Sequence, residues 1–285
     1  SFEQLEIHQT TDKSQIISRA KDCQIIITNK VAITSEIMKQ LPKLKLISVL
    51  ATGKNIIDLE AAGQNNITVK NVTNYSTNSV AQITFAMILE LSSNLHEYNQ
   101  ICKDGRWSNQ DLFCYLGQGF SELKGKNLGI IGYGNIGKKI AKIAKAFDMN
   151  ILICKSLSSA NENHDDRISL TEILKQSDFL TLHCPLTSET NNLIKYAELS
   201  MMKKTAIILN LARGGIINEA DLAKILLEKK IQAAAIDVMS QEPPPIDHPL
   251  LNPKLDNLLI TPHIAWASFQ AQQELIDQTV RNICS

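Results

Sequence analysis

Short runs of consecutive apolar residues alternate with amphipathic stretches over the second half of the chain. The amphipathic stretches carry apolar residues at steps of three and four, which predicts helices such as Ile136–Phe147, Leu170–Gln176 and Glu219–Lys229. The apolar runs predict buried strands at Leu128–Ile131, Ile151–Cys154, Phe179–His183, Ala206–Leu211, Ala233–Val238 and Leu258–Thr261. Strands and helices in strict alternation predict a parallel sheet covered on both faces, the doubly wound α/β fold.

The N-terminal part shows the same alternation on a smaller scale. Ile25–Ile27 and Leu46–Leu50 predict buried strands, and between them lies a helical pattern over Thr34–Leu41 that Pro42 ends. Because 285 residues exceed the usual size of one domain, we expect two α/β domains.

A long helical pattern lies between these two parts of the chain. It begins at Thr77 or Ser79, either of which can cap a helix, and Gly105 is a plausible end. Its single apolar face consists of Val80, Ile83, Met87, Leu91, Leu95, Tyr98 and Cys102. The pattern predicts one continuous helix that bridges the two domains.

Composition narrows the classes of partner. Lys plus Arg and Asp plus Glu number 29 each, so the formal net charge is zero and no global field attracts nucleic acid or an anionic membrane. The sequence contains no apolar run of the roughly 18 residues that a transmembrane helix needs. Six scattered cysteines without a CxxC pair predict free thiols packed as small apolar residues in a reducing cytoplasm, and no metal site.

A glycine-rich loop follows the first strand of the second part directly. Gly132, Gly134 and Gly137 form GxGxxG with Asn135 and Ile136, and a helical pattern begins there. In this context Gly132 serves the tight turn, Gly134 the approach of a pyrophosphate, and Gly137 close packing of helix on strand. The helix N-terminus then offers N–H groups to phosphate, so we predict a dinucleotide site.

The end of the second strand bears on the choice of cofactor. An Asp or Glu there binds the ribose hydroxyl of NAD, but this chain has Lys155 and Ser156, followed by Ser158 and Ser159. An ammonium group beside hydroxyls attracts a 2′-phosphate, which predicts that NADPH is preferred over NADH. A solvated lysine beside a tolerant NAD site is the alternative.

Three polar residues follow the ends of later strands, where ligands gather in open α/β sheets. Arg213 suits a carboxylate, His263 suits proton transfer near neutral pH, and a nearby Glu242 would orient the ring and favour the imidazolium. Each residue alone also has an ordinary structural explanation. Together they predict hydride transfer to a small 2-keto acid.

Several segments, in order, match one known family over nearly the whole chain. They are Val49–Asp58, Asn74–Thr77, Ser79–Gln82, Glu122–Lys126, Leu182–Thr187, the Arg213 segment, Ile236–Val238 with Glu242–Pro243, and Thr261–Trp266. The chain resembles the D-isomer-specific 2-hydroxyacid dehydrogenases, particularly the glycerate dehydrogenase or hydroxypyruvate reductase branch. The resemblance implies a Rossmann cofactor domain over residues 95–266 and a discontinuous, flavodoxin-like substrate domain over 1–94 plus 267–285, with a cleft that closes on substrate.

The resemblance also implies roles for individual residues. Arg213, Glu242 and His263 are the expected catalytic set, and Thr52, Gly53, Arg213 and Trp266 are expected to contact the substrate. Thr84 is expected to contact a cofactor phosphate and Asp237 to face the nicotinamide amide. The full expected cofactor-binding set is Val80, Thr84, Gly132, Gly134, Asn135, Ile136, Gly137, Lys155, Ser156, His183, Cys184, Pro185, Leu211, Ala212, Arg213, Asp237, His263 and Ala265.

The resemblance to this branch implies that hydroxypyruvate and glyoxylate are the expected substrates, reduced to D-glycerate and glycolate or formed in the reverse direction. Two alternatives stay open: a 3-phosphoglycerate dehydrogenase, and a non-catalytic module that senses the cofactor for a protein partner. The resemblance implies a homodimer clasped by residues 95–125, with Trp107–Phe120 either an arm or an ordinary surface loop. Because family chains usually extend further at both ends, we expect that this chain is trimmed.

Overall fold

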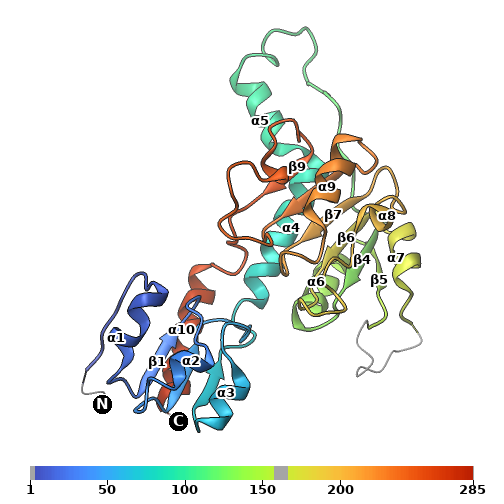
Figure 1. Cartoon of the computed structure of the whole chain (residues 1–285). Helices are drawn as coiled ribbons and strands as arrows, with labels where there is room; N and C mark the ends of the chain where they lie inside the picture. Colours follow the sequence, from blue (N-terminus) through green and yellow to red (C-terminus); the bar gives the residue numbers. More distant parts are fainter. Residues whose placement is uncertain (1–3, 157–165, 285) are drawn as a thin grey trace. The chain divides into compact units, whose positions relative to one another are not determined.

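The computed structural model describes residues 4–156 and 166–284. The chain forms two compact units, one made of Ser1–Ser76 and Ser268–Ser285 and the other of Thr77–Ala267 (Figure 1). The first unit is therefore discontinuous in sequence.

The smaller unit is built on three parallel strands in the order β1-β2-β3. Ile47 and Val49 of the middle strand are fully buried. The C-terminal helix packs against β2 and β3. There Lys70 Nζ donates to the carbonyl oxygen of Asn282 at 2.8 Å. The elements of this unit are η1 (Lys13–Gln15), α1 (Ile16–Ala20), β1 (Ile25–Thr28), α2 (Ser35–Met38), β2 (Leu46–Val49), α3 (Leu59–Gln64), β3 (Thr68–Asn71) and α10 (Phe269–Cys284).

The larger unit holds a parallel six-stranded sheet in the order β5-β4-β6-β7-β8-β9. At the β5 edge of the sheet, Ile168 forms an isolated parallel bridge to Cys154, the residue that follows β5. Ile168 thus occupies the place of a further edge strand beside β5. The resulting order is that of a dinucleotide-binding sheet. The strands are β4 (Asn127–Ile131), β5 (Asn150–Ile153), β6 (Phe179–Leu182), β7 (Ile207–Asn210), β8 (Ala233–Ile236) and β9 (Leu258–Ile260).

Helices cover both faces of this sheet. Successive residues of each strand point to opposite faces, so one strand contributes to the apolar clusters on both sides. In β7, Ile207 and Leu209 belong to the apolar cluster under α4 and α6, whereas Ile208 belongs to the cluster under α7, α8 and α9. The predicted doubly wound α/β fold is therefore confirmed. The remaining elements are α4 (Thr77–Ser93), α5 (Leu95–Lys103), α6 (Asn135–Ala146), α7 (Leu170–Gln176), α8 (Tyr196–Leu199), α9 (Glu219–Leu227) and η2 (Pro249–Leu251).

The prediction of one continuous helix from Thr77 to Cys102 was wrong. The helix is broken at Asn94, whose φ of 54° lies in the left-handed region that asparagine tolerates. The apolar periodicity continues across the break, so it gives no sign of the change in direction. α5 and the segment that follows it extend away from the sheet of the larger unit (Figure 1).

The division between the units also lies earlier than we expected, at residue 76 and not at residue 94. The cause is α4, which packs against α6 and contributes Val80, Met87 and Ile88 to the core of the larger unit. α4 therefore begins the larger unit instead of ending the smaller one.

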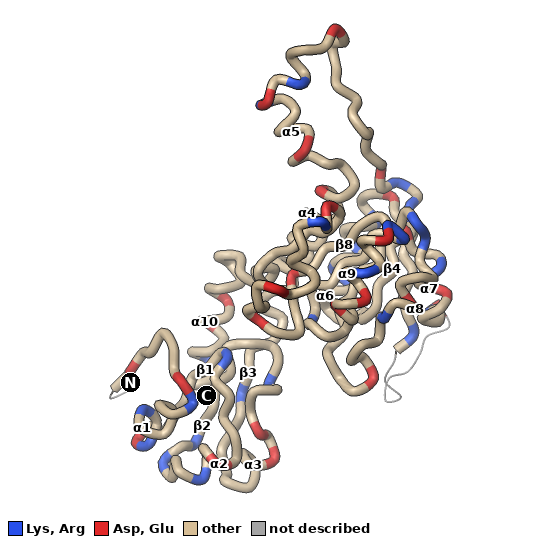
Figure 2. Tube along the Cα trace, turned by 45° about the horizontal axis from the view of Figure 1, so that its top comes forward, with Lys and Arg blue, Asp and Glu red and all other residues tan. Residues whose placement is uncertain are grey.

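Charge is evenly mixed over the molecule. Lys and Arg are interspersed with Asp and Glu along the traces of both units (Figure 2). Among the helices that the structure describes, none combines the length and apolar character needed to cross a bilayer.

Candidate active site

The glycine loop joins β4 to α6 and lies against the loop that follows β6. Gly132 has a φ of 97°, and a Cβ atom there would lie 2.4 Å from the backbone nitrogen of Cys184. A Cβ atom on Gly137 would lie 2.4 Å from the carbonyl oxygen of Gly132. Only glycine therefore fits at these two positions, in the tight turn and at the close helix packing that the motif predicts.

The same loop fits a dinucleotide pyrophosphate. Gly134 is the N-cap of α6, a Cβ atom there would meet no protein atom within 4 Å, and the first turn of the helix carries no acidic residue. A side chain at Gly134 would fill the cradle in front of the helix N-terminus, where phosphate is favoured. The loop also lies at the carboxyl end of β4, between β5 and β6, where doubly wound sheets bind ligands.

His183 and Cys184 border this loop at the end of β6. His183 Nε2 lies 2.8 Å from Thr181 Oγ1, whereas Nδ1 is buried without a hydrogen-bond partner among the described residues. Burial lowers the pKa of His183 to about 3, so its ring is neutral at pH 7. Burial likewise raises the pKa of Cys184 to about 11, which keeps this thiol protonated. An enclosed polar nitrogen beside the glycine loop is a further feature that suits a bound cofactor.

The cysteines follow the prediction in part. All six are free, as expected. Cys154 and Cys184 are buried, but Cys102 and Cys284 are exposed, so the expectation that all six pack as small apolar residues was wrong. Among the described residues, no group of three or more His, Cys, Asp or Glu side chains could hold a metal ion.

Lys155 and Ser156 follow β5, as the sequence indicates, and the Lys155 side chain is exposed. Glu172 on α7 lies near enough to interact with its charge. Hydrogen bonds from Ser169 lower the pKa of Glu172, and the charge of Lys155 adds to this effect. The predicted hydroxyls of Ser158 and Ser159 lie outside the described residues.

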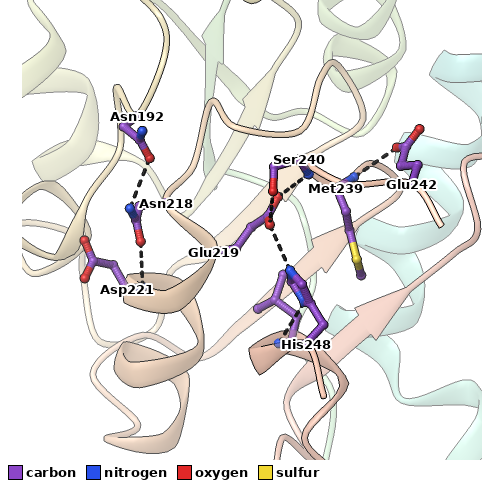
Figure 3. A network of polar contacts seen from close by, with 9 residues as sticks. Asn192, Asn218, Glu219, Asp221, Met239, Ser240, Glu242 and His248 are labelled. Atoms are coloured by element: carbon purple, nitrogen blue, oxygen red, sulfur yellow. Dashed lines mark hydrogen bonds and ion pairs between the residues drawn. The ribbon is translucent and has the colours of Figure 1, made fainter. Parts of the chain in front are cut away.

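Two members of the predicted catalytic set meet directly. His263 Nδ1 lies 2.6 Å from Glu242 Oε2, with side-chain exposures of 28% and 30%. The other carboxylate oxygen of Glu242 accepts from the backbone N–H of Met239 at 3.0 Å (Figure 3). The ring and the carboxylate thus orient each other, although 21 residues separate them in sequence.

Arg213 lies at the end of β7, the strand next to β8 in the sheet. Asn210 shapes its loop, donating from Nδ2 to the Arg213 carbonyl oxygen at 2.9 Å and accepting from the Ala212 N–H at 3.1 Å. The guanidinium donates to the Ala212 carbonyl oxygen at 2.7 Å. Within the described residues it forms no hydrogen bond or ion pair with Glu242 or His263, and its side chain is exposed.

Asp237 has a role that the sequence did not reveal. Its buried carboxylate accepts from Thr261 Oγ1 at 2.5 Å and from the backbone N–H groups of Ile264 and Ala265 at 2.9 and 3.0 Å. These three donors flank His263, whose φ of 54° is uncommon for a non-glycine residue. Asp237 therefore holds the strained loop that presents His263. The expected contact between Asp237 and the nicotinamide amide stays a prediction.

Of the remaining residues expected to bind substrate or cofactor, Thr84 is inaccessible, and the roles of the others stay predictions. Thr84 is fully buried, and its hydroxyl donates to the Val80 carbonyl oxygen within α4, so in this conformation it offers nothing to a phosphate. Thr52 and Gly53 follow β2 in the smaller unit, and their part in binding the substrate carboxylate stays a prediction. The same holds for Trp266 and for Val80, Pro185, Leu211, Ala212 and Ala265.

Comparisons with known proteins agree with the fold and with the glycine loop. The family model described as D-isomer specific 2-hydroxyacid dehydrogenase, NAD binding domain, matches residues 85–265. A hydroxypyruvate reductase from Blautia hydrogenotrophica is 40% identical over 275 residues, which cover 96% of this chain and 85% of that protein. A glycerate dehydrogenase from Methylorubrum extorquens is 40% identical over 278 residues, which cover 98% and 87%.

A solved structure extends the likeness to three dimensions. The D-lactate dehydrogenase from Aquifex aeolicus, complexed with NAD and lactic acid, matches with a TM-score of 0.80 at 30% identity and covers 94% of this chain and 84% of that one. Together with the dinucleotide-binding sheet and the glycine loop, these matches show a nicotinamide-dependent oxidoreductase. The chain belongs to the D-isomer-specific 2-hydroxyacid dehydrogenases, in the branch that includes glycerate dehydrogenase and hydroxypyruvate reductase.

Proposed function

We propose that this enzyme reduces hydroxypyruvate and glyoxylate to D-glycerate and glycolate, and catalyses the reverse reactions. The contact of His263 with Glu242, at the end of the sheet that also carries Arg213 and the glycine loop, is the observation that carries this proposal. The relatives named hydroxypyruvate reductase, glycerate dehydrogenase and glyoxylate reductase support the choice of substrates.

A nicotinamide cofactor, whose pyrophosphate the glycine loop Gly132–Gly137 would hold, would supply the hydride that C2 of the keto acid needs. Arg213 binds the carboxylate of the substrate, because its planar fork can donate two hydrogen bonds at once. His263 Nδ1 is engaged by Glu242, so the other ring nitrogen, Nε2, delivers the proton to the carbonyl oxygen. Hydride and proton together convert the keto group into an alcohol, and in the reverse reaction His263 accepts the proton.

The test is nicotinamide absorbance during turnover of the purified protein with hydroxypyruvate, glyoxylate, pyruvate and phosphohydroxypyruvate. Fastest oxidation of the reduced cofactor with hydroxypyruvate or glyoxylate is the expected result. Fastest turnover of phosphohydroxypyruvate would indicate the 3-phosphoglycerate dehydrogenase alternative. Cofactor binding without turnover of any acid would overturn the proposal in favour of a cofactor sensor.

We also propose that NADPH is preferred over NADH, because Lys155 occupies the place where a carboxylate would repel a 2′-phosphate. A charge-assisted contact contributes about 1.5–3 kcal/mol, and solvent screening reduces this for an exposed lysine. We therefore expect Lys155→Ala to raise the Kd for NADPH about tenfold and to leave the Kd for NADH almost unchanged. Fluorescence titration measures both constants. Lys142→Ala on α6 is the matched control, and a wild-type preference for NADH would contradict the proposal.

A homodimer clasped through the segment after α5 is a further proposal. Its apolar side chains are strongly exposed in the single chain, with Leu112, Phe113, Leu116 and Phe120 at 67, 90, 73 and 69%. Exposed apolar groups of this density are typical of interaction surfaces.

We expect light scattering to show a dimer for the wild type and a monomer for the variant Phe113→Asp/Leu116→Asp, because charges in the interface would have to be desolvated. Phe269→Asp is the control, since Phe269 is 88% exposed on α10. A monomeric wild type would show that residues 107–120 form an ordinary surface loop.

The cytoplasm is the proposed location. Six free thiols suit a reducing compartment, where they persist without forming disulfides.

A further inference from the structure

A second pair of a glutamate and a histidine lies close to the first. Glu219, the first residue of α9, accepts from the backbone N–H of Ser240 at 2.6 Å, from Ser240 Oγ at 2.6 Å and from His248 Nε2 at 3.0 Å (Figure 3). The side chains of Glu219 and His248 are only 12% and 10% exposed. A largely buried carboxylate is thus committed to one backbone turn and one ring.

The orientation of the His248 ring is set by the backbone. The N–H of Leu250 donates to His248 Nδ1 at 3.3 Å, so Nδ1 is the acceptor and Nε2 carries the proton that points at Glu219. His248 is also followed directly by η2 (Pro249–Leu251), which holds it in place. The ring therefore acts as a fixed donor that orients the Glu219 carboxylate.

The turn that is hydrogen-bonded to Glu219 through Ser240 also contains Glu242. Met239 precedes Ser240, and its N–H donates to Glu242 Oε1, while Glu242 Oε2 meets His263 Nδ1. The Arg213 loop braces the same turn, because a Cβ atom on Gly214 would lie 1.9 Å from the carbonyl carbon of Met239 and 2.3 Å from the nitrogen of Ser240.

We infer that Glu219, oriented by His248, is a positioning residue: it holds the turn 239–242 so that Glu242 meets His263. The inference rests on the proposed function and adds two residues that do not touch the reacting groups. A simpler explanation is that Glu219 only stabilises the N-terminus of α9, where negative charge is favourable. Asp221 lies in the same first turn and accepts from the backbone N–H of Tyr196 at 3.0 Å, so it separates the two explanations.

The experiment compares Glu219→Ala and Glu219→Gln with Asp221→Asn. We expect Glu219→Ala to lower kcat about 10- to 100-fold, since misplacement of a catalytic group by about 1 Å has an effect of this size. The KM for hydroxypyruvate and the Kd for the cofactor should change little. Glu219→Gln should retain more activity than Glu219→Ala, because its amide oxygen still accepts from Ser240, and Asp221→Asn should keep the wild-type kcat.

A double-mutant cycle with Glu242→Ala identifies the route of the effect. If Glu219 acts through Glu242, then Glu219→Ala causes almost no further loss of kcat in the Glu242→Ala background. Additive losses would overturn the inference, and so would a wild-type kcat in both Glu219 variants. Thermal unfolding measures whether each variant is folded. If Glu219→Ala does not fold, the same comparison is made with Glu219→Gln.

A readout without turnover keeps this inference separate from the proposed function. Proton NMR of the folded protein follows the Nδ1–H of His263 bonded to Glu242, assigned with His263→Gln. We expect this signal to broaden or disappear in Glu219→Ala and to persist in Asp221→Asn. If the wild type turned over none of the acids, the proposed function would fail, whereas an unchanged signal in Glu219→Ala would overturn the positioning role alone.

Discussion

Replacing His263 by alanine should lower kcat by about 100- to 10,000-fold, the usual contribution of a positioned acid or base. The reason is that Nε2 of this ring is the proposed proton donor to the carbonyl oxygen, while Nδ1 is engaged by Glu242 at 2.6 Å. The Kd for the reduced cofactor should stay close to the wild-type value, because the glycine loop that fits its pyrophosphate is unaffected. Single-turnover kinetics and fluorescence titration measure the two quantities separately.

Two further variants sharpen this test. His8→Ala, at an exposed histidine of the smaller unit, should keep the wild-type kcat. Glu242→Gln should lie between the wild type and His263→Ala, because the amide still orients the ring but no longer offers a negative charge to it. A wild-type kcat in His263→Ala would remove this residue from the mechanism.

Replacing Asp237 by alanine should have the largest combined effect on stability and turnover. Thr261 Oγ1 and the N–H groups of Ile264 and Ala265 all lose their acceptor. The Ala265 hydrogen bond is buried and the other two are partly buried, and a donor left unpaired in a buried place costs about 1–3 kcal/mol. We therefore expect the free energy of unfolding to fall by about 1–3 kcal/mol. The loop should also relax from the left-handed backbone at His263, which would lower kcat.

Urea and thermal unfolding measure the first effect, and steady-state kinetics measure the second. Asp237→Asn should be milder, because its single carbonyl oxygen still serves Thr261 and Ile264 while its NH₂ group faces the N–H of Ala265. Asp256→Ala is the control: this side chain is 69% exposed and its ion pair with Lys229 contributes little. Equal stability of Asp237→Ala and Asp256→Ala would show that Asp237 does not hold the loop.

The alternation of strands and helices from residue 127 to residue 260 could be predicted because it is a local property. Helices cover both faces of this sheet, so its central strands appear as unbroken apolar runs, and β7 and β8 are buried at every position. β3 had no such signal. As the last strand in its sheet it is only partly buried, with the sequence Thr68–Asn71, and we predicted no strand there.

The glycine loop could be assigned from sequence for a related reason. Its function depends on the backbone conformation of six consecutive residues. That conformation leaves no room for a Cβ atom at Gly132 or Gly137, so the two glycines reveal it in the sequence. The residues proposed as the catalytic set could also be chosen from the sequence, because each follows a predicted strand. The sequence could suggest, but not demonstrate, that Glu242 and His263 meet. Their contact depends on the conformations of two loops that follow neighbouring strands.

Tertiary structure alone decided the contacts between loops. Four features leave no trace in the periodicity of apolar residues. They are the helix break at Asn94, the burial of Thr84, the hydrogen bonds from the His263 loop to Asp237, and the contacts of Glu219 with His248 and Ser240. The pattern of apolar residues records which face of an element is buried, and this determines the fold class. It does not record strand order or loop conformation, and these bring residues 20 to 30 positions apart into hydrogen-bond contact: 21 for Glu219 and Ser240, 29 for Glu219 and His248.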